Sequence, residues 1–200
     1  TYHQGDEDIH ALDHLSVEID EGEFVCLSSP SGGGKTTLLN AIGGLDKPDS
    51  GEVWIGEQRI DNLSKGDLAD LRLRQIGFVF QAYNLIPVLT ARESVEFVML
   101  VQGVAACERG RTTMDILEEV GLAGLEDRRP AEMSGGQQPR VAVARAIVSR
   151  PRLVLADEPT ANLDSKTSDE LMGLFTELNQ HHGTTFVIAT HDQRVMRYAR

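Results

Sequence analysis

Short apolar runs alternate along the chain with longer segments of helical periodicity. Four of these runs predict buried strands, at residues 24–27, 76–80, 153–156 and 185–189. Continuous apolar runs of this length are typical of strands that are covered on both faces, as in an α/β sheet. A further run at residues 52–55 alternates polar and apolar positions and predicts a half-exposed strand. The pattern therefore predicts an α/β fold built on a mostly parallel sheet.

A helix is predicted between the third and fourth of these strands. The spacing of one apolar helix face is met by four residues, Leu171, Leu174, Phe175 and Leu178. Gly183 then provides a C-terminal end. His181 and His182 precede it, and they could form a metal pair. They are adjacent rather than helix-spaced, so a favourable contact with the helix dipole explains them better.

The stretch from about residue 82 to residue 130 interrupts the alternation of strands and helices. Its best helical patterns cover residues 94–104 and 112–120. We expect a helical subdomain inserted into the sheet core. The predicted organisation is a core made of residues 1–81 and 151–200, and a helical subdomain at 82–150.

Composition excludes several classes of function. The chain of 200 residues has a formal net charge of −12, which argues against a nucleic-acid binder and against direct adhesion to anionic lipid. No apolar segment approaches the roughly 20 residues of a membrane-spanning helix, so we expect no direct membrane insertion. Cys26 and Cys107 do not suggest a disulfide framework, which favours a reducing, cytoplasmic setting. Any membrane role should therefore depend on a protein partner.

A glycine-rich segment connects the first predicted strand to a helix at residues 38–42. Such a loop turns backbone N–H groups inward as an anion site, and the helix N-terminus adds its positive end. Lys35 would reach the β- and γ-phosphates, and the Thr36 hydroxyl would bind Mg²⁺. Ser29 stands where the usual pattern has glycine, and a left-handed conformation there would cost roughly 1–2 kcal/mol. The predicted nucleotide-binding residues are Ser29, Pro30, Ser31, Gly32, Gly33, Gly34, Lys35, Thr36 and Thr37.

Polar residues follow the other three buried strands, at the edge where ligands of open α/β sheets bind. Asp157 suits the shell of a magnesium ion, and Glu158 beside it can orient and deprotonate an attacking water. Gln81 could contact both the metal shell and that water. His191 is predicted to contact the γ-phosphate. The predicted metal ligands are thus Thr36, Gln81 and Asp157, and the predicted catalytic residues are Glu158, His191 and Gln81.

A second anion site is predicted at residues 134–137. Ser134 is expected to cap the helix that runs through residues 141–148, with Gln137 as its capping-box partner. Gly135 and Gly136 expose backbone N–H groups at this helix start. The helix would span about 22 Å at 1.5 Å per residue, which would place the segment far from its own phosphate loop. It is therefore expected to meet a nucleotide held by a second subunit. An ordinary capped helix would leave the two glycines unexplained.

These segments resemble the motifs of ABC ATPases, in the order and spacing of that family and over essentially the whole chain. Residues 29–36, Gln81, 134–137, 157–158, 162–164 and His191 are similar to the Walker A, Q-loop, signature, Walker B, D-loop and H-switch. The resemblance implies a RecA-like P-loop NTPase core. It also adds Tyr2, as the aromatic residue that stacks on adenine, and Asp164 to the nucleotide site. Residues 78–87 and 156–164 resemble the macrolide-exporter and lipoprotein-release branch.

The resemblance implies an ATP-hydrolysing transporter subunit that uses ATP and Mg²⁺. It would act as a head-to-tail homodimer with integral membrane permease subunits, at the inner face of the cell membrane. Residues 81–88 would dock that partner, although internal packing is the alternative for their apolar part. Two other functions stay open: a division-type ABC ATPase that signals across the membrane, and a soluble ABC ATPase of DNA repair or translation. The latter class usually carries long coiled-coil inserts or two ATPase domains.

The chain departs from the family pattern at Pro139, where the family usually has glutamine. Proline lacks an N–H and would crowd the carbonyl of Gly135 four residues back, which predicts a kink in the signature helix. By the same resemblance, the family pattern extends before Thr1 and beyond Arg200.

Overall fold

Four parallel strands form the central sheet of the computed structural model, which describes residues 2–4, 7–30 and 32–199. Their spatial order is β3 (Phe24–Ser28), β8 (Thr185–Thr190), β7 (Leu153–Asp157) and β6 (Ile76–Val79). All three pairings are parallel. The predicted α/β fold is therefore confirmed, and each of the four buried strands lies within about one residue of its predicted position.

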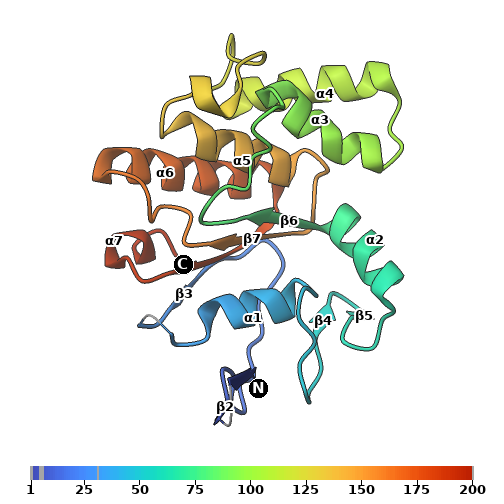
Figure 1. Cartoon of the computed structure of the whole chain (residues 1–200), viewed down its shortest axis with the longest axis vertical. Coiled ribbons are helices and arrows are strands. Elements are labelled where there is room, and N and C mark those ends of the chain that lie inside the picture. Colours follow the sequence, from blue (N-terminus) through green and yellow to red (C-terminus); the bar gives the residue numbers. More distant parts are fainter. Residues whose placement is uncertain (1, 5–6, 31, 200) are drawn as a thin grey trace.

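Alternate residues of the central strands face two separate apolar layers. Val154 and Phe186 belong to one core cluster, whereas Leu155 and Val187 belong to the other. Helix α1 (Lys35–Ile42) covers the second face, and α5 (Gln137–Ile147) with α6 (Ser165–His182) covers the first (Figure 1). Burial on both faces explains why β7 and β8 are almost continuously apolar.

Helices α3 (Ala91–Val101) and α4 (Ala106–Glu119) pack with α5 above the sheet (Figure 1). The predicted helices began at residues 94 and 112, and both starts were wrong. Helix α3 begins earlier because Thr90 and Glu93 form a capping box. The first two turns of α4 are rich in charged and small residues, so apolar periodicity could not show them.

The C-terminal end of α6 follows the prediction. Gly183 adopts a left-handed φ of 65° and ends the helix. The Nε2 atom of His182 lies 2.9 Å from Oε1 of Glu119, and the Nδ1 atom of His181 lies 3.7 Å from the same oxygen. The described residues contain no group of three or more side chains that could hold a metal ion. These histidines therefore join the ends of α6 and α4.

The remaining elements lie at the edges of the molecule. Two short hairpins pair β1 (Tyr2–Gln4) with β2 (Glu7–Ile9), and β4 (Trp54–Ile55) with β5 (Gln58–Arg59). Strand β4 is half exposed as predicted, since Trp54 is 55% exposed and Ile55 is buried. Helix α2 (Lys65–Gln75) precedes β6, the 3-10 helix η1 (Pro130–Glu132) precedes the signature segment, and α7 (Gln193–Met196) follows β8. In the described part of the chain, no helix has the length and apolarity needed to cross a membrane.

Candidate nucleotide-binding and hydrolysis site

The carboxyl ends of β7 and β8 meet the start of α1 at one edge of the sheet. The Thr36 hydroxyl donates a 2.9 Å hydrogen bond to Oδ2 of Asp157, the last residue of β7. The Nζ atom of Lys35 lies 3.8 Å from Oε1 of Glu158. The Nδ1 atom of His191, just beyond β8, lies 2.8 Å from the same Glu158 oxygen. The fold thus brings together five of the predicted site residues from three distant segments.

The phosphate loop owes its shape to its glycines. Gly32 and Gly34 have φ values of 81° and 78°, which are strained for any residue with a side chain. A β-carbon on Gly33 would lie 2.3 Å from the Ser29 hydroxyl oxygen, so this glycine permits a close approach. Ser29 itself does not have a positive φ, so the cost that a left-handed serine would carry does not arise. Ser31 lies outside the described residues.

Lys35 is the first residue of α1, and its side chain reaches back over this loop. Its ammonium group donates to the carbonyl oxygen of Ser29 at 2.7 Å and to that of Pro30 at 3.3 Å. Only 10% of its side chain is exposed. A largely buried cation at the N-terminus of α1, beside the glycine-rich loop, is well placed for an anionic ligand. Thr37 lies half-buried in the first turn of the same helix.

Asp157 carries one carboxylate oxygen without a protein partner. Its Oδ2 accepts from Thr36, whereas its Oδ1 is buried and has no hydrogen-bond partner among the described residues. Burial raises the pKa of Asp157, and the hydrogen bond from Thr36 opposes this only in part. An unsatisfied carboxylate oxygen beside a threonine hydroxyl suits a hard divalent cation such as Mg²⁺. The residues present therefore fit the predicted metal.

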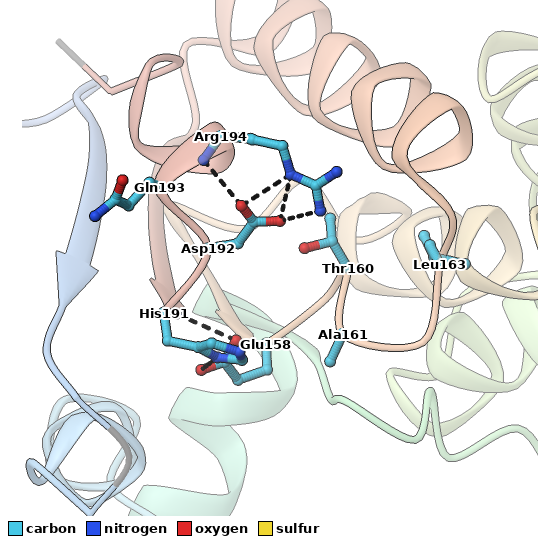
Figure 2. A pocket seen from close by; sticks show the side chains of 8 residues that line it. All are labelled: Glu158, Thr160, Ala161, Leu163, His191, Asp192, Gln193 and Arg194. Atoms are coloured by element: carbon cyan, nitrogen blue, oxygen red, sulfur yellow. Dashed lines mark hydrogen bonds and ion pairs between the residues drawn. The ribbon is translucent and has the colours of Figure 1, made fainter.

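Glu158 has a strained backbone that the sheet holds in place. Its φ is 46°, in the left-handed region that non-glycine residues rarely adopt, and its N–H donates to the carbonyl of Ala189 at 2.9 Å. The carboxylate contacts the ring of His191 at the wall of a cavity of about 350 Å³ (Figure 2). The cavity is lined by Glu158, Thr160, Ala161, Leu163, His191, Asp192, Gln193 and Arg194. Strain at a carboxylate in a cavity is typical of functional positions.

Three predicted site residues lie apart from this cluster or outside the described contacts. Gln81 is exposed two residues beyond the end of β6, and its carbonyl oxygen accepts a 3.3 Å hydrogen bond from Asn162. Asp164 caps α6, where its carboxylate accepts from the N–H groups of Lys166 and Thr167 at 3.0 Å. Tyr2 lies in β1, and its side chain is outside the described part. The roles predicted for these three residues stay predictions.

The start of the signature helix differs from the prediction. Ser134 is not its N-cap: α5 begins at Gln137, with Gly136 in the N-cap position and no side-chain cap. The carbonyl of Ser134 accepts from the N–H of Gln137 at 3.0 Å, so the chain makes a turn before the helix starts. Half of the expected capping box is present, because the Ser134 N–H donates to Oε1 of Gln137 at 3.0 Å. Ser134 and Gly135 are exposed.

Pro139 does not interrupt this helix. It is the third residue of α5, which runs without a break from Gln137 to Ile147. The first N–H groups of any helix have no intrahelical partner, so the missing N–H of Pro139 costs no hydrogen bond. Pro139 lies in the first turn because the helix starts later than the sequence indicated.

Arg145 is a structural partner of the site that the sequence reasoning missed. Its guanidinium on α5 donates to the carbonyl oxygens of Tyr83 at 2.8 Å and Asn84 at 2.7 Å. Both carbonyls belong to residues with a positive φ, 58° and 47°. Burial lowers the pKa of Arg145. Its position as a cation within the otherwise apolar run of residues 141–148 was the available signal for a buried partner.

Comparisons with known proteins agree with this geometry. The family model for the ABC transporter matches residues 12–161. An uncharacterized ABC transporter ATP-binding protein of Methanocaldococcus jannaschii, MJ0796, is 46% identical over 99% of this chain and 86% of its own length. The lipoprotein-releasing system ATP-binding protein LolD of Saccharophagus degradans is 40% identical, over 96% of this chain and 84% of that protein. The macrolide export ATP-binding/permease protein MacB of Rhodopirellula baltica is 43% identical, over 99% of this chain and 29% of that protein.

A solved structure shares the fold. The dimeric post-hydrolysis state of the MJ0796 cassette, bound to ADP and Pi, superimposes with a TM-score of 0.90 at 44% identity, covering 99% of this chain and 87% of that chain. The predicted P-loop NTPase core and the resemblance to the macrolide-exporter and lipoprotein-release branch are confirmed. The chain therefore belongs to the ABC transporter family, of which it is an ATP-binding and ATP-hydrolysing subunit.

Proposed function

We propose that this chain acts as a head-to-tail homodimer that hydrolyses MgATP and drives a membrane subunit engaged in export or lipoprotein release. The observation that best supports this proposal is a cluster of side chains at one edge of the sheet, formed by Lys35, Thr36, Asp157, Glu158 and His191. The proposed division into a core of residues 1–81 and 151–200 and a helical subdomain of residues 82–150 follows the packing of α3, α4 and α5 on one side of the sheet.

In this proposal the chain holds the nucleotide through its phosphate loop. Lys35 leaves the carbonyl oxygens of Ser29 and Pro30 and pairs with phosphate oxygens, which carry more charge. The N-terminus of α1, which begins at Lys35, would offer its free backbone N–H groups to the same oxygens. Thr36 and Asp157 would hold Mg²⁺, which neutralises charge on the phosphates. The buried, unpartnered Oδ1 of Asp157 supports that assignment.

Glu158 is the proposed general base. Its carboxylate would orient the attacking water and accept its proton. Lys35 and His191 both lie near Oε1 of this carboxylate. The Nδ1 atom of His191 faces Glu158, so Nε2 is the ring nitrogen available to a γ-phosphate oxygen. Positioning and electrostatic stabilisation are the main contributions to phosphoryl transfer.

The signature segment is proposed to serve the nucleotide of the partner copy. Ser134 and Gly135 are exposed at the N-terminus of α5, where backbone N–H groups attract anions. The solved MJ0796 cassette is described as a dimer with ADP and Pi, which supports the same assembly for this chain.

The membrane subunit is proposed to dock on the loop after β6. Ile86 and Val88 are 46% and 71% exposed, whereas Leu85 packs against the core. Internal packing therefore accounts for Leu85 but not for the other two residues. Exposed neighbouring apolar side chains favour a protein contact. In this arrangement the chain is peripheral at the cytoplasmic face of the membrane, and cargo specificity belongs to the membrane subunit.

Capture from native membranes tests this proposal. Tagged Glu158→Gln protein, loaded with MgATP to hold the closed state, should retain a membrane protein with a large extracytoplasmic domain. The matched control adds Val88→Asp, which should lose the membrane protein but keep ATP binding. Capture of no membrane protein would contradict the transport proposal and favour a soluble ABC ATPase. A captured membrane protein bound to a wall hydrolase would favour the division-type alternative.

A further inference from the structure

Gly136 of the signature segment is a glycine for a packing reason. Its φ and ψ are −82° and −20°, a right-handed conformation that any residue can adopt. A β-carbon placed on it would lie 2.8 Å from the Cγ2 methyl of Thr167, closer than real β-carbons approach other atoms. The methyl of Thr167, in the first turn of α6, therefore lies directly against the backbone of the signature segment.

The direction of this methyl is fixed by Asp164. The Thr167 hydroxyl donates to Oδ2 of Asp164 at 2.7 Å, and the Thr167 N–H donates to Oδ1 at 3.0 Å. A β-branched side chain has few rotamers in a helix, and the hydroxyl bond selects one of them. Asp164 thus caps α6 and, through Thr167, also sets which way the methyl points.

The first turns of α6 also contact the segment that follows β8. Arg194, which follows the site residue His191 by three positions, contacts the Ser165 hydroxyl and forms a two-pronged pair with Asp192 (Figure 2). Arg197 pairs with Asp169 at 2.5 Å. The start of α6 therefore lies between the segment after β8 and the signature segment and contacts both.

We propose that Thr167 is a positioning residue, whose methyl sets the place of Gly136 and hence of the anion site that this chain offers to its partner's nucleotide. The proposal rests on the proposed function, in which the signature segment acts on a second copy. Thr167 touches no nucleotide itself and acts through Gly136. Asp164, expected from the family resemblance at the nucleotide, acts here through Thr167.

Two isosteric or near-isosteric variants separate the methyl from the hydroxyl. Thr167→Ser removes the methyl and keeps the hydroxyl that donates to Asp164. Thr167→Val keeps a methyl and removes that hydroxyl hydrogen bond. Each is made in the Glu158→Gln background and compared with Glu158→Gln alone. The readouts are the dimerisation constant at saturating MgATP, measured by analytical ultracentrifugation, the ATP affinity of the monomer, and the melting temperature without nucleotide.

Thr167→Ser should weaken dimerisation about tenfold, because substitutions that act on a site through a packed neighbour change the coupling by roughly 2- to 30-fold. Its monomer affinity for ATP should stay at the value of the parent, and its melting temperature should fall by at most about 3 °C, the effect of one lost methyl. Thr167→Val should show the opposite pattern, with a clearly lower melting temperature and dimerisation close to that of the parent, because valine carries a methyl at both γ positions and its isosteric rotamer keeps one of them against Gly136.

Two results would overturn the role of Thr167 and leave the proposed function intact. One is normal dimerisation of Thr167→Ser, and the other is parallel losses of dimerisation and melting temperature in both variants. The second result would show a merely structural role. A parent Glu158→Gln protein that binds MgATP and stays monomeric would overturn the proposed contact in trans and the role of Thr167 together.

Discussion

The hydroxyl of Thr36 donates a 2.9 Å hydrogen bond to Oδ2 of Asp157, a residue 121 positions further along the chain. This bond joins the start of α1 to the end of β7 and leaves the other oxygen of Asp157 buried without a partner. Both residues belong to the three that the sequence pattern predicted as magnesium ligands, the third being Gln81. The contact therefore connects the glycine-rich loop to Glu158, the proposed general base next to Asp157.

Glu158→Gln should bind ATP but hydrolyse it at least about 100-fold more slowly, because an amide cannot accept the proton of the attacking water. Steady-state release of phosphate and equilibrium binding of ATP measure the two effects separately. Glu177→Gln, the same change on an exposed residue of α6, is the control and should keep full activity. Turnover of Glu158→Gln at the rate of the parent would refute the role of Glu158 as the base.

Lys35→Ala should weaken ATP binding by about 1.5–3 kcal/mol, the usual contribution of a hydrogen bond to a charged group. Calorimetric titration with ATP measures the change. Lys47→Ala removes the same charge from an exposed position outside the loop and should leave the affinity unchanged. Equal affinities for the Lys35 variant and the parent would count against the phosphate cradle.

Asp157→Asn should stabilise the nucleotide-free protein at neutral pH. Burial raises the pKa of Asp157, so the folded state holds this proton more tightly than the unfolded chain does. The free energy of unfolding therefore falls as pH rises from 3.8, the ordinary pKa of an aspartate, to the raised pKa of folded Asp157. Above that raised pKa the buried carboxylate is charged, and it destabilises the folded state to its full extent. Urea unfolding across pH should show the advantage of asparagine at pH 7 and its disappearance below pH 3.8.

Asp61 provides a control of the opposite sign for this pH experiment. Hydrogen bonds from Arg59 and from the N–H of Val53 lower the pKa of Asp61 to about 2. Asp61→Asn should therefore destabilise the protein at neutral pH, and its disadvantage should fade as pH falls from 3.8 toward 2. An advantage of Asp157→Asn that did not change with pH would contradict the electrostatic explanation.

Arg150→Gly should raise the free energy of unfolding by about 0.5–1 kcal/mol. Arg150 is exposed after α5 with a φ of 52°, a left-handed conformation that disfavours side chains and suits glycine. Ser149→Gly, one position earlier and without a positive φ, should instead lower stability by roughly 0.5 kcal/mol, through the entropy of the unfolded chain. Chemical denaturation compares the two, and destabilisation by both would argue against strain at Arg150.

Many residues of the candidate site could be predicted because short sequence patterns are enough to locate them. A residue that ends an apolar run in a parallel sheet lies at the ligand-binding edge, so Asp157, Glu158 and His191 could be assigned before their contacts were known. The glycines around Lys35 likewise indicate an anion loop. The start of α5 could not be assigned in this way, because Ser134 followed by Gln137 permits either a cap or a preceding turn. That choice also decided the effect of Pro139.

The sequence by itself determined the elements of the sheet, the family and the candidate residues of the nucleotide site, because apolar periodicity and motif spacing are properties of neighbouring positions. Only the tertiary structure decided the spatial order β3, β8, β7, β6, the unpartnered oxygen of Asp157 and the contact of Gly136 with Thr167. These features join segments that are remote along the chain. Their geometry follows from how the helices pack on the sheet, and no local pattern encodes that packing.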